Sequence, residues 1–168
     1  MAAVELANSG LDPDTMTRVE DLDRFFVQHV YTGSHTRSTE ELDAVRALRA
    51  PLRALFRSDR DEAVEIVNAM LADARALPQL VRHGDVGWHI HAIGPEAPLA
   101  TRILVETAMA MIDVIRADEM DRFSVCADAE CEDIVLDLSR NRSRKFCSVT
   151  CGNRNAVAAY RARQRAAG

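Results

Sequence analysis

Apolar residues recur every three or four positions along most of the N-terminal 120 residues, which places them on one face of an α-helix. The pattern predicts helices over residues 17–30, 38–56, 58–77 and 99–117. Side chains suited to N-caps precede three of them, at Thr17, Ser38 and either Ser58 or Asp59. Because proline lacks the helical N–H group, Pro51 predicts a kink or a break, and Pro78 predicts the end of the third helix.

A different pattern follows the third helix. Apolar and polar residues alternate with a period of two over residues 80–93, and Gly84 and Gly87 lie in the middle, which predicts a β-hairpin. Histidines on this hairpin are candidate ligands for a second metal, with metal-free surface imidazoles as the alternative. These histidines are His83, His89 and His91. The adjacent Trp88 is expected to pack on the helices; the alternative is that it lines a pocket for a small-molecule effector.

The last quarter of the chain holds every cysteine, in two close pairs with the pattern C-x4-C and C-x3-C, separated by fifteen residues: Cys126, Cys131, Cys147 and Cys151. Two such pairs across a short loop are typical of a tetrahedral zinc site. All five histidines lie outside this segment, so we predict one structural Zn²⁺ with four thiolate ligands and no open position. The alternative is four buried or oxidised cysteines without metal.

The predicted architecture is mainly α with a small β-hairpin, an α+β fold of two parts. A helical body spans residues 1–122, and a treble-clef-like zinc module spans residues 123–168. Within the module a strand over 134–138 separates the cysteine pairs, and a basic helix over 148–165 ends the chain. Because the connection between the parts is short, we expect the module to pack against the body. The body is also a candidate surface for a homodimer.

Charge is distributed unevenly along the 168 residues. The net charge is −5, yet residues 139–168 carry eight basic residues and no acidic one, and residues 1–125 carry a net charge of −8. A basic end on an acidic body indicates local contact with a polyanion; a solvated helix end is the alternative. Apolar runs are too short to span a membrane, and residues 1–5 do not resemble a signal peptide, so we expect a cytoplasmic protein.

The basic segment supplies the candidate contacts to nucleic acid. If residues 139–145 are extended, their alternate arginines point to one side, and arginines at spacings of seven and four share one face of the final helix. The candidates are Arg140, Arg142, Arg144, Lys145, Asn153, Arg154, Asn155 and Arg161. The asparagines have an alternative role as caps of backbone groups, and we expect one or two arginines to pair with nearby acidic residues instead. Gly152 is expected to allow an unusual backbone angle or a close approach.

The segment from Asp137 to Ser148, followed by Cys151-Gly152-Asn153-Arg154, resembles the CGNR zinc finger. Before it, Leu6-Ala7-Asn8-Ser9 and residues 45–49 resemble the ABATE domain, a bacterial family described as stress-induced transcription regulators. The resemblance implies four cysteine zinc ligands, DNA binding and transcription regulation. The chain departs from the family at Phe146, where tryptophan is common, and in its last cysteine pair, where many members have one more residue.

Three functions follow from these patterns. The first is a zinc-containing bacterial transcription regulator that binds duplex DNA. The second is an interaction or ligand-sensing protein in which zinc is purely structural. The third is an enzyme or ligand-binding protein with a deep pocket near Trp88, but the sequence has no P-loop, Rossmann fingerprint, nucleophile elbow or HExxH motif, so we expect no enzyme.

Overall fold

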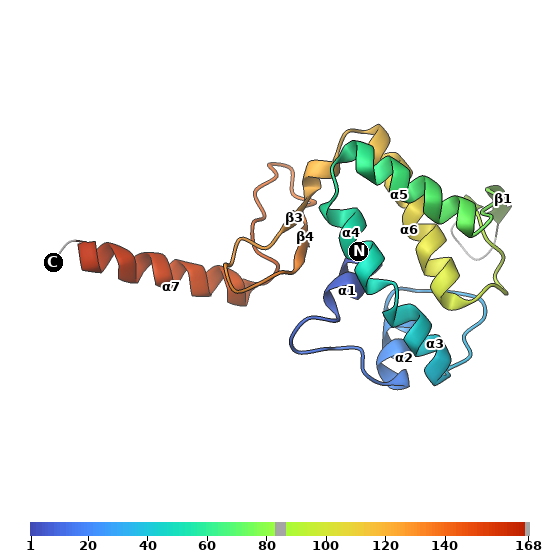
Figure 1. Cartoon of the computed structure of the whole chain (residues 1–168), viewed down its shortest axis with the longest axis horizontal. Helices are drawn as coiled ribbons and strands as arrows, with labels where there is room; N and C mark the ends of the chain where they lie inside the picture. The colour runs from blue at the N-terminus through green and yellow to red at the C-terminus, as the bar shows by residue number, and fades with distance from the viewer. Residues whose placement is uncertain (83–86, 167–168) are drawn as a thin grey trace.

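A computed structural model describes residues 1–82 and 87–166 of the chain. The body on the right of Figure 1 is built from the helices α1 (Ala2–Asn8), α2 (Val19–Gln28), α3 (Thr39–Arg46), α4 (Arg49–Arg57), α5 (Arg60–Asp73) and α6 (Leu99–Arg116). Helix α5 packs along α6, and α4 lies against both α1 and α5. Their apolar stripes meet in one core, where Leu6, Leu22, Leu52 and Ile103 are fully buried.

Two of the predicted caps are confirmed, and one is displaced by a residue. The side chains of Ser38 and Asp59 accept the N–H groups of Glu41 and Glu62, as an N-cap does. At α2 the N-cap is Arg18 rather than Thr17, and the stabilising carboxylate belongs to Asp21. Hydrogen bonds from the N–H groups of Thr17 and Arg18, assisted by Arg24, lower the pKa of Asp21 to about 2.

The expected break near Pro51 lies slightly before it. Helix α3 ends at Arg46 and α4 begins at Arg49, so Pro51 occupies the first turn of α4, where its missing N–H has no intrahelical role. The predicted end of the third helix at Leu77 is wrong, because α5 ends at Asp73. Arg75 adopts a φ of 50°, and the N–H of Leu77 donates to Ala92 in the following hairpin instead of continuing the helix.

The two strands of the predicted hairpin are present, while Gly84 of its turn lies outside the described residues. Strand β1 (Gln79–Arg82) pairs antiparallel with β2 (Trp88–His91), with Leu80 opposite Ile90. Gly87 has a φ of 76°, a conformation that suits glycine at the entry to β2. Trp88 does not pack on the helices, since 69% of its surface is exposed.

The C-terminal module follows the 3₁₀ turn η1 (Met120–Arg122) and contains β3 (Phe123–Val125), β4 (Ile134–Leu136) and the final helix α7 (Val149–Ala166). Strands β3 and β4 form a second antiparallel hairpin, with Ser124 opposite Val135. The fold is therefore α+β with a zinc module. No described helix combines the length and apolarity needed to cross a membrane.

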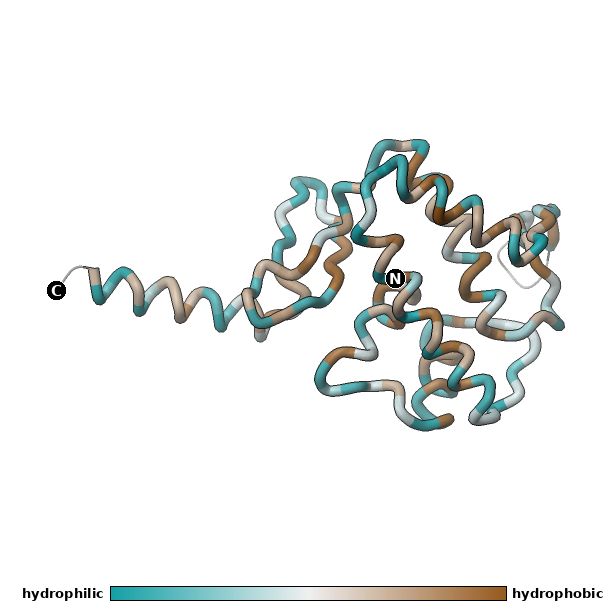
Figure 2. The backbone as a smooth tube through the Cα atoms, viewed as in Figure 1, coloured by the Kyte–Doolittle hydropathy of each residue, from teal (hydrophilic) through white to brown (hydrophobic). Residues whose placement is uncertain are grey.

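The hairpin of the module is docked on the body. Ile134 belongs to the main core, and the ring of Phe123 stacks on Phe56 of α4 with 4.8 Å between centroids. The Asn8 side chain at the end of α1 donates to the Ile134 carbonyl at 2.9 Å and accepts its N–H at 2.8 Å. Helix α7, in contrast, extends from the module in the direction away from the body (Figure 1). In Figure 2 the strongly apolar segments gather in the body, while α7 alternates between polar and weakly apolar positions.

Candidate metal centre and the basic surface beside it

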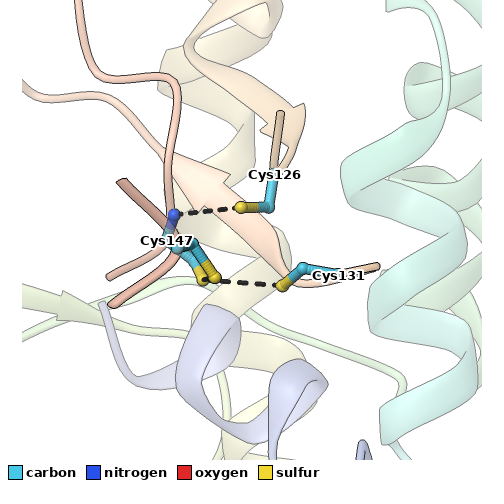
Figure 3. A group of neighbouring side chains, drawn as sticks. Cys126, Cys131 and Cys147 are labelled. Carbon is cyan, nitrogen blue, oxygen red and sulfur yellow. Dashed lines mark hydrogen bonds between the residues drawn. The ribbon is translucent and has the colours of Figure 1, made fainter. Parts of the chain in front are cut away.

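The four cysteines converge on one point. Their sulfur atoms all lie within 4.8 Å of one another, and the Sγ of Cys147 is 3.6 Å from that of Cys131 and 3.6 Å from that of Cys151. Figure 3 shows Cys126, Cys131 and Cys147 pointing toward each other from separate segments. Zn–S bonds of about 2.3 Å in a tetrahedron place sulfur atoms about 3.8 Å apart. The cluster therefore fits one zinc ion with four cysteine ligands, as the sequence predicted.

Backbone hydrogen bonds hold the first pair in place. Cys126 follows directly after β3, and its N–H donates to the Asp133 carbonyl at 2.8 Å. The N–H of Cys131 donates to the Asp128 carbonyl at 2.9 Å, which closes the loop between the two cysteines. Because both ends of the loop are fixed by the backbone, the two sulfur atoms meet without relying on side-chain packing.

The second pair is set by the start of α7. Ser148 precedes the helix, and its hydroxyl accepts the N–H of Cys151 at 3.2 Å, so the first turn presents Cys151 and Cys147 on one side. The N–H of Cys147 points to the Sγ of Cys126 at 3.4 Å and would stabilise negative charge on that sulfur. The centre thus has both its ligands and a donor that supports them.

Protonation links metal binding to pH. Burial raises the pKa of the Cys131 thiol to about 11 and that of Cys147 further. Coordination requires thiolates, so zinc has to displace these protons when it binds. The module packs few apolar side chains around the cysteines, with Val135 as the buried aliphatic residue among those described. Bound zinc would add to these contacts a folding free energy of the size seen in small zinc domains, about 10–16 kcal/mol.

Gly152 does not play the role that the sequence suggested. It lies inside α7 without a positive φ, and an added Cβ would meet the Phe146 ring at 3.7 Å, an ordinary contact. The glycine is therefore not required by backbone geometry or by close packing. Asn155 does satisfy a backbone group, since its side chain donates to the Cys151 carbonyl at 2.9 Å, whereas Asn153 is exposed.

The basic loop over residues 139–145 is not extended. Arg142 has a φ of 48°, and its N–H turns back to the Ser139 carbonyl. The buried carboxylate of Asp137 organises the loop by accepting the N–H groups of Ser139 and Arg144, each at 2.7 Å. Hydrogen bonds from Ser139 in particular hold the pKa of Asp137 below its ordinary value. The turn arises because one carboxylate binds two backbone groups five residues apart, so the arginines do not form a single row.

Three of the candidate DNA-binding arginines have partners within the protein. Arg142 pairs with Asp121 and Glu119. Arg144 donates to the backbone carbonyls of Phe146 and Cys147, at 3.3 and 2.8 Å. Arg154 lies 3.4 Å from Asp128 and 3.3 Å from Glu130. The expectation that one or two arginines pair with acidic residues of the cysteine segment holds for Arg154. Arg142 also forms ion pairs, but its partners lie outside that segment.

The remaining basic candidates are exposed and make no ion pair with the described residues: Arg140, Lys145 and Arg161. Arg163 and Arg165, which were outside the predicted contact set, are exposed in the same way. Val157 and Tyr160 on the same helix are 47% and 57% exposed, because α7 leaves the module after its first turns. Of the described residues of α7, only Cys151 is buried.

Two further features of the body bear on its possible binding sites: a pair of histidines and a cavity. The Nε2 atoms of His89 and His91 lie 3.0 Å apart, while His83, the third candidate ligand, lies outside the described residues. A cavity of about 490 Å³, which the sequence did not predict, lies where the body meets the module. Its walls come from segments as distant as Tyr31 and Leu138, and no local pattern marks such a meeting. Trp88 is not among its lining residues.

Comparison with known proteins identifies the families to which the chain is related. Residues 1–118 match the ABATE family, described as a putative stress-induced transcription regulator, and residues 122–164 match the CGNR zinc finger. No curated protein matches the chain. The first match covers more than half of the sequence, and the cysteine cluster supplies the zinc site that the second implies. The chain therefore belongs to the ABATE family and carries a CGNR zinc finger at its C-terminal end.

Proposed function

We propose that this protein is a bacterial transcription regulator that binds duplex DNA through α7 and the basic loop before it, with no enzymatic activity of its own. The proposal includes a cytoplasmic location and a role in the response to stress, as the family description suggests. The observation that carries it is α7 itself. This helix of 18 residues has four arginines and no acidic residue, and it extends from the zinc centre into solvent.

The shape and charge of α7 suit a DNA groove. A helix of this length spans about 27 Å, and the major groove is wide enough to admit an α-helix. Arg154, Arg161 and Arg165 share one face, since their spacings of seven and four residues correspond to whole turns. Arg161 and Arg165 are free to bind phosphates or guanine edges, whereas Arg154 is held by Asp128 and Glu130 and would first have to leave them. In this proposal the exposed side chain of Asn153 contacts a base.

The zinc module gives this helix a fixed starting point. Cys147 and Cys151 flank the helix start, so coordination of one metal orients α7 relative to β3 and β4. The basic loop over residues 139–145 lies next to the same centre through the contacts of Arg144 with Cys147. In this proposal zinc is structural, the loop contributes phosphate contacts through Arg140 and Lys145, and α7 supplies the contacts that distinguish sequences.

The decisive experiment is selection of duplexes from a random pool with the purified, zinc-loaded protein. We expect one enriched motif, and we expect Cys147→Ser to abolish it because the helix loses its anchor. Arg161→Ala with Arg165→Ala should weaken enrichment, while Arg57→Ala at the exposed end of α4 serves as the matched control. A palindromic motif would indicate that a homodimer binds. No enrichment from protein that retains one zinc per chain would contradict the proposal and favour a protein-interaction role.

A further inference from the structure

The cavity between the body and the zinc module has the properties of a small-molecule site. Its volume of about 490 Å³ lies within the range of about 300–1,000 Å³ usual for ligand pockets. One side is formed by α6 and the N-terminal residues of α1, and the other by Phe123, Leu136 and Leu138 of the module. Ligand sites occur preferentially at such junctions between structural units.

The floor of the cavity is one face of α6. Glu106, Ala110, Asp113 and Ala117 recur at intervals of four and three residues, so they line up along the helix. The two alanines keep the floor low and leave space above it, while Met111 and other apolar side chains form the walls. This arrangement combines a large apolar surface with a small number of charged groups.

The charges on the lining are not balanced. Arg122, the basic residue of the lining, pairs with Glu119 and donates to the Asp137 carbonyl at 3.0 Å, so its charge is already compensated. Glu106 makes no ion pair with the described residues. Asp113 has a partner in Arg116, but at 3.9 Å and with both side chains in solvent that pair is weak. Two carboxylates are therefore available to a ligand.

The surroundings of Glu106 favour a cation beside it. The neighbouring protein atoms desolvate the carboxyl and raise its pKa, and the charge of Arg102, one turn earlier on α6, offsets part of this rise. Burial, with the charge of Glu106 as a second cause, also raises the pKa of Tyr31, so its hydroxyl keeps its proton and can donate a hydrogen bond. A cationic group near Glu106 would replace the lost hydration of the carboxylate.

We propose that this cavity binds a small organic cation, with an aromatic or aliphatic group against the apolar walls and a protonated amine at Glu106. The inference rests on the proposed function only for its consequence in regulation, because binding itself can be measured without DNA. The site would make the body the sensor and the zinc module the output of one regulator.

The route from the cavity to the basic loop is short. Leu138 lines the cavity and directly precedes Ser139, the first residue of that loop. Glu119 also lines the cavity and pairs with both Arg122 and Arg142, so it joins the rim to the loop. A ligand that contacts these residues should alter DNA affinity by about 5- to 150-fold, the usual range of coupling between two sites. An amine that binds the cavity and leaves DNA affinity unchanged would overturn this regulatory part.

The binding test uses the zinc-loaded full chain and isothermal titration calorimetry. The probes are a panel of protonated amines from butylamine to tryptamine, with 2-phenylethylamine compared directly with 3-phenylpropionate, which has a similar size and the opposite charge. We expect at least one amine to bind at one per chain and to raise the unfolding temperature. The carboxylate should bind at least about tenfold more weakly, the factor that a charge-assisted hydrogen bond supplies.

Variants assign the binding to the cavity. Glu106→Gln should weaken the amine by about tenfold or more, and Ala110→Phe should abolish binding by filling the space above α6. Glu65→Gln, on the exposed surface of α5, is the matched control and should bind like the wild type. Circular dichroism and zinc content establish that each variant is folded. Equal binding of amine and carboxylate, an unaffected Glu106→Gln variant, or failure of the whole panel at millimolar concentration would overturn the proposal. Chain that binds amines but selects no DNA would leave the cavity assignment standing while the proposed function fails.

Discussion

At the scale of single residues, two carboxylates determine local structure by binding pairs of backbone N–H groups. Asp21 accepts those of Thr17 and Arg18, each at 2.9 Å, and Asp137 accepts those of Ser139 and Arg144. Sequence patterns located the zinc ligands correctly, because their spacing is itself the signature of the site. They could not locate these carboxylate contacts, which depend on where the chain turns, nor the contacts of Arg142 with residues twenty positions earlier.

The carboxylate of Asp21 makes stability depend on pH in a defined direction. Its pKa in the folded protein is about 2, below the ordinary 3.8 of an aspartate. The charged form therefore stabilises the folded state at pH values above 3.8, and this contribution is lost as the pH falls through about 2. We expect Asp21→Asn to reduce the free energy of unfolding at pH 6, and the difference from wild type to shrink between about pH 4 and 2.

Urea unfolding of both proteins at matched pH measures this difference, and acid-induced release of zinc affects both equally. Asp61→Asn, in the first turn of α5, reports the effect of removing an acidic charge that makes no side-chain hydrogen bond to the described residues. A difference for Asp21→Asn that stays constant down to pH 2 would show that the hydrogen bonds to Thr17 and Arg18 do not favour the charged form.

At the scale of elements, the junction between α1 and β4 joins the two parts of the chain. Asn8 makes two hydrogen bonds to the backbone of buried Ile134, over a sequence separation of 126 residues. Periodicity predicted most of the helices and the first hairpin, because each depends on residues close in sequence. Periodicity misplaced the end of α5, because the N–H of Leu77 donates to the Ala92 carbonyl instead of continuing the helix. It also could not predict the contact between Asn8 and Ile134.

Removal of the Asn8 side chain should loosen this junction. In Asn8→Ala the N–H and carbonyl groups of Ile134 lose their partners in a buried position, which costs about 1–3 kcal/mol for an unsatisfied group. Chemical denaturation of the zinc-loaded protein measures the loss. Asn68→Ala, on the exposed surface of α5, should change stability by less than about 0.5 kcal/mol. Equal stability of the two variants would mean that water or a shifted strand replaces the amide.

At the scale of the whole molecule, charge is separated along the longest dimension. The body carries an acidic excess, and the loop and α7 carry a basic excess. Composition alone revealed this division, since it needs no knowledge of the fold. It could not reveal that α7 projects with Tyr160 exposed, or that a cavity forms at the junction, because both depend on how distant segments meet.

This separation predicts how DNA affinity responds to salt. Each phosphate contact adds about −0.9 to the slope of log K against log salt concentration, so Arg161→Ala with Arg165→Ala should make the slope shallower by about 1.8. Fluorescence anisotropy of a labelled duplex between 50 and 200 mM salt, about the range over which the effect is large, measures it. Arg57→Ala should retain the wild-type slope. An unchanged slope in the double variant would place the phosphate contacts elsewhere.

The projection of α7 also separates the acidic body from the DNA phosphates, which carry charge of the same sign. The helix is about 27 Å long, whereas electrostatic interactions in physiological salt are screened over about 8 Å. A body with a net charge of −8 can therefore remain beyond the reach of those phosphates that the tip of α7 binds. At about 0.01 M salt the screening length grows to about 30 Å and exceeds the length of the helix. At this salt concentration the acidic body repels the DNA phosphates across the length of α7. This repulsion opposes the attraction between the phosphates and the basic tip of the helix.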